Sequence, residues 1–490
     1  MNVIGILFAV LGGVALWFAT SSGLWILGFF SISLLWLAVR GRGVAVGFGL
    51  GWLWGIAFFL PLVRWAAVST GLVAAQVALA AVEGLYLGVV GAMWALLAKE
   101  ERPARPWLRA LAAAAVFLAV EQIRGMWPYG GLPWGTLAFT FTNSPLVNYA
   151  PYGSTALVGA VAVVVGVIAA MLLRMSYLQA ATSAVVVLAL VIAPVVFPVG
   201  ARSSGSLNVA VVQGNVPPAG TDNRALVVTE NHVRATRELV ESAETTPDLI
   251  LWPESSSDRD IRADDAAGSL VFDMVADLGI PLVMGTQEYV EGGRYNDVLV
   301  ISPDGIVGRY SKQHPVPFGE YIPHRELIRS FTDVVDQVAT DMLAGTGEAR
   351  VNVPSLGVKV AVPICFEVAY TQIVAEAVRG SHLLVIPTNN ASFGTSELSA
   401  QQFAMTTFRA VETGRTAIQV STSGITGVAD PRGVVYETDL FTRDARVVKV
   451  ALHEQTTFAT RTAEQRAILV FVLGALGAIL AIGMSRQGRS

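Results

Sequence analysis

The chain has 490 residues, of which 53% are hydrophobic and 14% charged, and its formal net charge at pH 7 is -4. This length allows two or more domains, and the small net charge without a basic cluster argues against nucleic acid as a partner. One cysteine excludes an intramolecular disulfide, and five scattered histidines without an H-E-x-x-H pattern give no indication of a metal site.

Residues 1–200 are mostly apolar and predict a polytopic helical membrane domain. A bilayer core requires about 20 apolar residues per helix. Seven stretches approach that length, namely 2–20, 23–40, 43–63, 71–98, 108–123, 155–173 and 180–199. An eighth, at 466–485, predicts a C-terminal transmembrane helix. We expect the first stretch to stay uncleaved, because it has no Lys or Arg n-region and no cleavage site before a polar start.

Basic residues are concentrated in every second short loop. The loops after the second, fourth and sixth spans and the end of the chain carry Arg40, Arg42, Lys99, Arg102, Arg105, Arg109, Arg174, Arg486 and Arg489, whereas the alternate loops carry fewer, such as Arg64 and Arg124. Because short basic loops stay in the cytoplasm, both termini are expected inside. With seven spans before it, the region 205–457 is then expected on the outer face of the membrane.

Residues 205–457 have ordinary globular composition and alternate strand-like with helix-like segments. Strands are predicted at 207–216, 248–255, 281–289, 359–367 and 382–394, helices at 221–243, 269–279, 368–380 and 397–415, and hairpins at 296–312 and 416–435. The helix at 221–243 is expected to be capped near Thr221. This order predicts an α/β domain in which helices pack on sheets.

Three chemically capable side chains lie where predicted strands end, which is where sites form in α/β sheets. Glu254 follows the apolar run "DLILW", where burial would suit it as a general base. Lys312 would stabilise an oxyanion. Cys365 precedes a predicted helix, whose N terminus would favour the thiolate. Each also has an ordinary alternative: Glu254 as a salt-bridge or capping residue, Lys312 as a solvated lysine, and Cys365 as a small buried apolar residue.

Taken together, these residues resemble the Glu–Lys–Cys triad of the nitrilase superfamily, in the same chain order and about 58 and about 53 residues apart. The resemblance includes "VAVVQGNV", "LWPES", "YSKQHPVPFGEYIP", "ICFE", "PTNNASFG" and "QFAMTTFRAVETGR". The flanking spans, the continuation "FGEYIP" and the segment "GMWPYGGLPWGTLAF" resemble the membrane-integrated apolipoprotein N-acyltransferase family. The resemblance implies a transmembrane helical domain at 1–200, an αββα nitrilase-like sandwich at 205–457 and a last transmembrane helix at 466–485.

The resemblance also implies a reaction. An acyl chain would pass from a membrane phospholipid to a thioester on Cys365, and then to the α-amine of the S-diacylglyceryl cysteine of an apolipoprotein. Glu254 would act as general base and Lys312 would stabilise the oxyanion, without a cofactor, in a ping-pong scheme. This implies lipoprotein maturation in the bacterial cytoplasmic membrane, with the catalytic domain on the outer face. We expect a monomer, because one chain carries the whole triad.

Two further carboxylates and one aromatic residue match the family pattern. Glu320 and Glu367 would position Lys312 or the substrate amine, or else pair structurally with Arg409 or Arg415. Phe366 stands where relatives often have tyrosine, and the backbone amide beside the nucleophile would serve the oxyanion whatever the side chain.

Two substrate-binding residues are also implied, and one position departs from the pattern. Trp134 would line the lipid entrance, or else belong to an interfacial aromatic belt. Asn390, in "PTNN", is predicted to bind substrate. Ser392 stands where relatives often have tryptophan, and "PPAGTDN" follows the "QGN" opening in place of a Lys-Trp pair. These departures leave head-group and acyl-chain preference open.

Two alternatives from other classes remain open. A membrane-anchored amidohydrolase would use water as the second nucleophile with the same triad. A transporter or sensor would use the outer domain only to bind a ligand. A coupled transporter needs several buried charges in its spans, and we expect few here.

Overall fold

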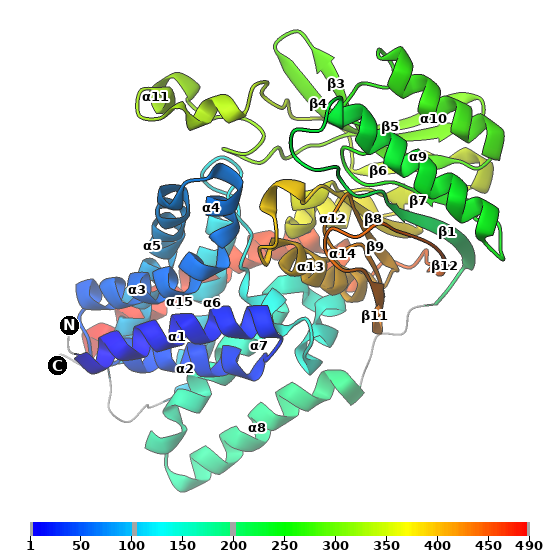
Figure 1. The fold of residues 1–490 in the computed structure, drawn as a ribbon. Coiled ribbons are helices and arrows are strands. Elements are labelled where there is room, and N and C mark those ends of the chain that lie inside the picture. Colours follow the sequence, from blue (N-terminus) through cyan, green and yellow to red (C-terminus); the bar gives the residue numbers. More distant parts are fainter. Residues whose placement is uncertain (1–2, 100–104, 197–201, 488–490) are drawn as a thin grey trace. The chain divides into compact units, whose positions relative to one another are not determined.

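The computed structural model describes residues 3–99, 105–196 and 202–487, and it divides into two compact units (Figure 1). The first unit is formed by the residues before 200 together with 396–401 and the residues after 461, and the second by 200–395 and 402–461. Arg102 and Arg489, used above to orient the chain, lie outside the described residues, as do the last three residues of the span predicted at 180–199.

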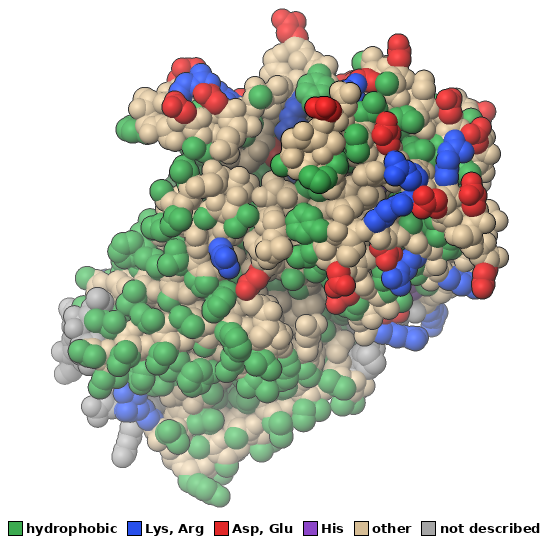
Figure 2. Space-filling model, viewed as in Figure 1, with side chains coloured by type: hydrophobic (Ala, Val, Ile, Leu, Met, Phe, Trp, Pro, Cys, Tyr) green, Lys and Arg blue, Asp and Glu red, His purple; other side chains and the backbone are tan. Residues whose placement is uncertain are grey.

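The first unit is a bundle of apolar helices, and a helix lies at each predicted span. These helices are α1 (Val3–Ser22), α2 (Ile26–Val39), α3 (Val44–Leu62), α4 (Arg64–Thr70), α5 (Val73–Leu97), α6 (Pro106–Arg124), α7 (Ala150–Met171), α8 (Tyr177–Val196) and α15 (Ala463–Gln487). In the described part of the chain, seven helices are long and apolar enough to cross a membrane, whereas α2 has only 14 residues. On the face drawn in Figure 2, hydrophobic side chains cover this unit.

Glycines let α3 and α5 approach each other closely. A Cβ added to Gly51 would lie 2.3 Å from the carbonyl oxygen of Leu87, and one added to Gly91 would lie 2.3 Å from that of Gly47. Only residues without a side chain fit at such contacts, and small residues are how membrane helices bring their backbones together. The pairing therefore depends on these glycines.

The second unit contains two six-stranded sheets. The first has the order β12-β1-β2-β3-β4-β5, with β12 (Asp444–Leu452), β1 (Gly205–Gln213), β2 (Leu249–Leu251), β3 (Leu282–Val290), β4 (Gly293–Ser302) and β5 (Gly305–Ser311). The second has the order β11-β10-β9-β8-β7-β6, with β11 (Gly433–Glu437), β10 (Gly427–Asp430), β9 (Ala417–Ser421), β8 (Leu383–Thr388), β7 (Val358–Ala361) and β6 (Arg350–Val353). Each sheet has three adjacent parallel strands, β1-β2-β3 and β7-β8-β9, and antiparallel strands at its edges.

Helices cover both sheets, so the layers form the αββα sandwich that the resemblance implies. α9 (Arg224–Ser242) and α10 (Asp265–Leu278) pack on the first sheet, and α12 (Thr371–Val378) and α13 (Leu398–Thr413) lie against the second (Figure 1). The sheets contact each other through β5 and β6 and through β1 and β9. The short helices α11 (Arg325–Arg329) and α14 (Phe458–Arg461) complete the unit. Apolar side chains such as Ile250, Leu282 and Met274 are buried between the first sheet and its helices.

The structure corrects three local expectations. The strand predicted at 359–367 ends at Ala361, because Pro363 has no N–H to donate to a neighbouring strand. Cys365 then begins a short 3-10 helix (Cys365–Ala369). The helix predicted from 221 begins at Arg224, and the Thr221 hydroxyl instead donates to the carbonyl of Pro218. Strands β6 and β12 were not predicted.

Candidate active site

Glu254, Lys312 and Cys365 converge beyond the ends of three strands, β2, β5 and β7. Glu254 follows β2, Lys312 directly follows β5, and Cys365 follows β7. Cys365 has a φ of 52° and Ser255, beside Glu254, has a φ of 51°. Non-glycine residues rarely adopt this left-handed region, which costs about 1–3 kcal/mol, and such strain is found where a fold must aim a side chain.

Glu254 is a buried carboxylate that is held by three donors. Its Oε1 accepts from the side-chain amide of Asn296 at 2.6 Å and from Lys312 Nζ at 3.3 Å, and its Oε2 accepts from the backbone N–H of Asn389 at 2.8 Å. A Cβ at Gly285 on β3 would lie 2.6 Å from the Cα of Glu254, so only glycine lets the strand pass this closely. Position and orientation of the carboxylate are therefore both fixed.

Lys312 is fully buried between two carboxylates. Its Nζ lies 2.6 Å from Glu320 Oε1 and 3.3 Å from Glu254 Oε1. Burial alone would lower the pKa of Lys312, but the charges of Glu254 and Glu320 outweigh it and raise the pKa above its ordinary value. Lys312 is therefore a fixed ammonium at neutral pH. Glu320 is itself anchored, because its Oε2 accepts the Val316 N–H at 2.7 Å.

The Cys365 thiol lies within the electrostatic reach of this cluster. Burial raises the pKa of Cys365, and the charges of Glu254 and Glu320 raise it further, whereas Lys312 and a hydrogen bond with the Gln402 side chain lower it. Cys365 opens a 3-10 helix of five residues and not the α-helix predicted to follow it, since α12 begins only at Thr371. The raised pKa favours the thiol over the thiolate at neutral pH.

Glu367 binds backbone rather than Lys312 or an arginine. Its Oε1 accepts the N–H groups of Gln313 (2.7 Å) and His314 (3.0 Å), its Oε2 accepts that of Ile364 (2.7 Å), and the Tyr310 hydroxyl lies 2.9 Å from both oxygens. This fully buried carboxylate thus ties the residues after Lys312 to the residue before Cys365.

The arginines that were alternative partners for Glu320 and Glu367 bind other groups. Arg409 pairs with Glu412 at 2.6 Å and donates to the carbonyls of Val368 and Ala369, and Arg415 donates to the carbonyl of Ser381. Both arginines therefore hold the layers of the domain together.

Asn390 and Phe366 both lie beside this cluster. Asn390 is buried, and its Nδ2 donates to Gln402 Oε1 at 3.0 Å. Phe366 follows Cys365 directly, and its ring centroid lies 5.3 Å from that of Tyr370. In the described residues, no group of three or more His, Cys, Asp or Glu side chains is placed to hold a metal ion.

Trp134 belongs to the first unit, whereas the triad belongs to the second. It lies in the segment between α6 and α7, is only 3% exposed, and has its ring centroid 6.0 Å from that of Trp65. A side chain so buried is not an exposed belt residue.

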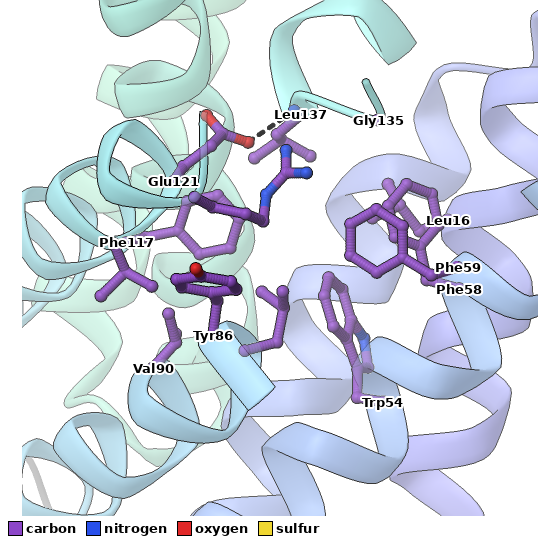
Figure 3. Close-up of a pocket in the computed structure, with 13 residues that line it drawn as sticks. Leu16, Trp54, Phe58, Phe59, Tyr86, Val90, Phe117, Glu121, Gly135 and Leu137 are labelled. Carbon is purple, nitrogen blue, oxygen red and sulfur yellow. Dashed lines mark hydrogen bonds between the residues drawn. The ribbon is translucent and has the colours of Figure 1, made fainter. Parts of the chain in front are cut away.

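The segment that carries Trp134 is fastened to α6 by two charged side chains. Arg124 Nη1 donates to the carbonyls of Leu132 (2.6 Å) and Trp134 (2.9 Å), and Glu121 accepts the Leu137 N–H at 2.8 Å. Figure 3 shows this last bond at the edge of a pocket within the bundle. Arg124 also forms an ion pair with Glu83 of α5 at 2.9 Å.

Among the described residues, few charged side chains are buried in the predicted spans. Glu83 and Arg109 lie inside them, and Arg124 directly follows one. Arg124 and Glu83 neutralise each other, and Arg109 donates to the carbonyl of Leu97. These charges are used to join helices and loops, which gives the transporter alternative no specific support.

Comparison with known proteins places this chain in a family. Residues 12–168 match the model for the apolipoprotein N-acyltransferase N-terminal domain, and residues 208–460 match the model for carbon-nitrogen hydrolases. An apolipoprotein N-acyltransferase from Mycolicibacterium smegmatis is 30% identical, with 98% of this chain and 85% of the relative covered. The chain belongs to the apolipoprotein N-acyltransferase family. The family predicted from the sequence motifs is thereby confirmed.

Other relatives agree. An apolipoprotein N-acyltransferase from Pseudomonas aeruginosa is 30% identical over 84% of this chain and 82% of its own length. A solved structure of an amidase from Nesterenkonia sp. covers 55% of this chain and 97% of the amidase, with 17% identity and a TM-score of 0.38. The family membership and the apolar helices describe a multi-pass bacterial membrane protein.

The sequence analysis did not identify four residues that form hydrogen bonds with Glu254, Asn390 or Glu367. These residues are Asn296, Asn389, Gln402 and Tyr310. The pair Asn389–Asn390 at the end of a buried strand was the one available signal, because polar residues at strand ends often face a site. Asn296 and Tyr310 lie inside a predicted hairpin, where nothing in the local pattern distinguishes them. Gln402 lies in a predicted helix whose polar residues have no assigned partner in the sequence.

Proposed function

We propose that this protein transfers an acyl chain from a membrane phospholipid to the α-amine of the S-diacylglyceryl cysteine of an apolipoprotein, through a thioester on Cys365. Family membership supports the acceptor class. The observation that carries the mechanism is the buried cluster of Glu254, Lys312 and Glu320, whose charges act on the Cys365 thiol. It holds a base and a fixed cation beside one nucleophile.

In the first half-reaction, Glu254 takes the thiol proton as Sγ attacks the ester carbonyl of the phospholipid. The ammonium of Lys312 stabilises the negative oxygen of the tetrahedral intermediate. The backbone N–H of Phe366 supplies a second donor to that oxygen. Collapse breaks the ester C–O bond, and the departing alcohol of the lysophospholipid takes the proton from Glu254. The product is an acyl thioester.

In the second half-reaction, the acceptor amine attacks the thioester carbonyl and gives a proton to Glu254. The C–S bond breaks, and the proton returns to Sγ, which restores the thiol and leaves an amide. Glu254 therefore acts as base and then acid in each half. Lys312 does neither, because Glu320 and Glu254 keep it charged.

The proposal extends to the setting of the reaction. The catalytic domain acts at the outer face of the bacterial cytoplasmic membrane, where both substrates are anchored in lipid. Trp134 lines the lipid entrance, and the enzyme works as a monomer. The alternation of basic loops supports this orientation.

Intact mass spectrometry of the purified full-length protein tests the proposal. After incubation with dioleoyl phosphatidylethanolamine in detergent, the protein should gain the mass of one oleoyl group, and Cys365→Ala should gain nothing. A synthetic S-diacylglyceryl-cysteine peptide should discharge the group within minutes and appear as the N-acyl product. The same peptide with an acetylated amine is the control and should leave the acyl-enzyme intact.

Two results would count against the proposal. Rapid discharge by water alone would indicate the amidohydrolase alternative. Absence of any acyl adduct with phosphatidylethanolamine, phosphatidylglycerol or cardiolipin would leave Cys365 without the role of acyl carrier.

A further inference from the structure

Asn390 has a buried hydrogen-bond acceptor that nothing in the described structure uses. The residue is 3% exposed, and its Oδ1 has no hydrogen-bond partner. An unsatisfied buried polar atom costs free energy, so its presence at a site calls for an explanation.

The orientation of the Asn390 amide follows from a one-way chain of donors. The Thr388 hydroxyl donates to the Ile386 carbonyl and accepts from Gln402 Nε2 at 3.3 Å, and Gln402 Oε1 accepts from Asn390 Nδ2 at 3.0 Å. Turning one amide alone would set like groups against each other, and turning both would take the Thr388 hydroxyl away from the Ile386 carbonyl. The chain therefore leaves the carbonyl oxygen of Asn390 as its unpaired end.

Asn390 lies between the base and the nucleophile. Its neighbour Asn389 donates its backbone N–H to Glu254 Oε2 at 2.8 Å. Its partner Gln402 is one of the groups that lower the pKa of the Cys365 thiol. A group that attacks the thioester and gives its proton to Glu254 must pass through this region.

We propose that Asn390 Oδ1 is the acceptor that positions the incoming amine of the second substrate, which makes Asn390 specific to the aminolysis step. This inference rests on the proposed function. A neutral primary amine has two N–H bonds and one lone pair. One N–H points to Glu254 and the other to Asn390, so the lone pair is turned toward the thioester carbon.

The step balances with these two acceptors. The amine lone pair forms the C–N bond, and the C–S electron pair returns to sulfur. One amine proton moves to Glu254 and then to Sγ, and the other remains in the amide N–H, still bonded to Asn390. No further reactant is needed.

The first half-reaction has no use for this acceptor. The ester group of the donor carries no N–H or O–H at the reacting centre. Its departing oxygen is electron-rich and takes its single proton from Glu254, so a second acceptor beside it offers no bond. Losing Asn390 Oδ1 should therefore slow aminolysis and spare acylation.

The test measures the two half-reactions separately on the full-length protein. Acyl-enzyme formation from dioleoyl phosphatidylethanolamine and its discharge by the S-diacylglyceryl-cysteine peptide are each followed by intact mass. For Asn390→Ala, the rate of discharge should fall about tenfold or more, as expected for one lost hydrogen bond, while the rate of acylation stays within about threefold. At a saturating concentration of the peptide, the maximal rate of discharge should still be reduced in Asn390→Ala.

Asn296 supplies the matched control. It is also a buried asparagine, and its Nδ2 holds Glu254 directly at 2.6 Å. Because Glu254 serves both half-reactions, Asn296→Ala should slow acylation and discharge together. Asn390→Leu, which keeps the branching of the side chain without an acceptor, guards against a defect caused by a cavity, and thermal unfolding checks the fold of each variant.

The outcomes separate the two proposals. Equal slowing of both steps in the Asn390 variants, or no slowing of discharge, would overturn the role of Asn390. Failure of the unaltered protein to form any acyl-enzyme would overturn the proposed function itself, and the inference with it.

Discussion

Charge balance among a few buried side chains governs this site at the residue scale. One ammonium, Lys312, lies between Glu254 and Glu320, and the side chains of Lys312 and Glu254 are 0% and 4% exposed. Buried charges are tolerated only when they are paired. The same pairing that stabilises the cluster keeps Lys312 positive, which is the state that the proposed mechanism requires.

Lys312→Met should therefore harm both activity and stability. Loss of the cation removes oxyanion stabilisation, for which we expect a fall of about a hundredfold to a thousandfold in acyl-enzyme formation. It also leaves two carboxylates unpaired, so the free energy of unfolding should fall by about 3–5 kcal/mol. Single-turnover mass spectrometry and denaturant unfolding measure the two effects. Lys359→Met, at an exposed strand position, is the control, and similar losses in both variants would contradict this account.

Glu367 should give the site a pH dependence. Burial raises the pKa of Glu367 to about 7, while its four surrounding donors require the ionised form. Below about pH 7 the carboxyl gains a proton, and the oxygen that carries it can no longer accept a backbone N–H, which changes the hydrogen bonds of the turn before Cys365. The rate of acylation should fall as the pH is lowered from 8 to 6.

Stability should move in the opposite direction. The folded pKa lies above the unfolded value of about 4.3, so the folded state holds a proton that the unfolded chain releases. The contribution of Glu367 to the free energy of unfolding is therefore largest below about pH 4 and is lost as the pH rises through about 7. Glu367→Gln, which resembles the protonated carboxyl, should keep the acylation rate near the low value of the unaltered protein at pH 6 and remove its dependence on pH. A rate that still falls between pH 8 and 6 in the variant would assign the dependence to another group.

At the scale of elements, α6 holds the segment that carries Trp134. The two N–H groups of Arg124 Nη1 are shared among three acceptors, the Glu83 carboxylate and the carbonyls of Leu132 and Trp134, and they hold the loop against the helix. Apolar surroundings leave these groups no water to bond instead. The loop is therefore as firmly placed as the helix that bears it.

Arg124→Met should destabilise the helical unit by about 3–5 kcal/mol, because it leaves the Glu83 carboxylate buried without a partner. Glu83→Gln combined with Arg124→Met should cost less than the sum of the two single changes. Thermal unfolding in detergent, read as a double-mutant cycle, measures the coupling. Strict additivity would mean that the two side chains do not stabilise each other.

The local sequence pattern predicted the helices and strands more accurately than the residues at which they end and the strands with which they pair. Apolar length located the membrane helices, and the order of Glu254, Lys312 and Cys365 indicated the site. The edge strand β12 was missed because "DARVVKVAL" follows a polar loop, and its position is set by pairing with β1. Asn296 reaches Glu254 only because β4 pairs with β3 and β5, and a contact made by strand pairing leaves no signature in the local sequence.

At the scale of the whole molecule, the orientation across the membrane can be tested with the single native cysteine removed. In a Cys365→Ser background, Asp304→Cys in the exposed β4–β5 turn should react with a membrane-impermeant maleimide in intact spheroplasts. Gly43→Cys, before α3 and with open space around it, should react only after permeabilisation. The reverse pattern would place the catalytic domain in the cytoplasm.

The pairing of β1 with β12 has a consequence for the chain as a polymer. Gly205, the first residue of β1, is paired in register with Leu452, the last residue of β12, so these two residues are held about 5 Å apart. The strand pair thus closes the long stretch of chain between them, and the entropy cost of that closure is offset inside the second unit. Because this cost grows only slowly with loop length, insertions in the loops between β1 and β12 should change it little.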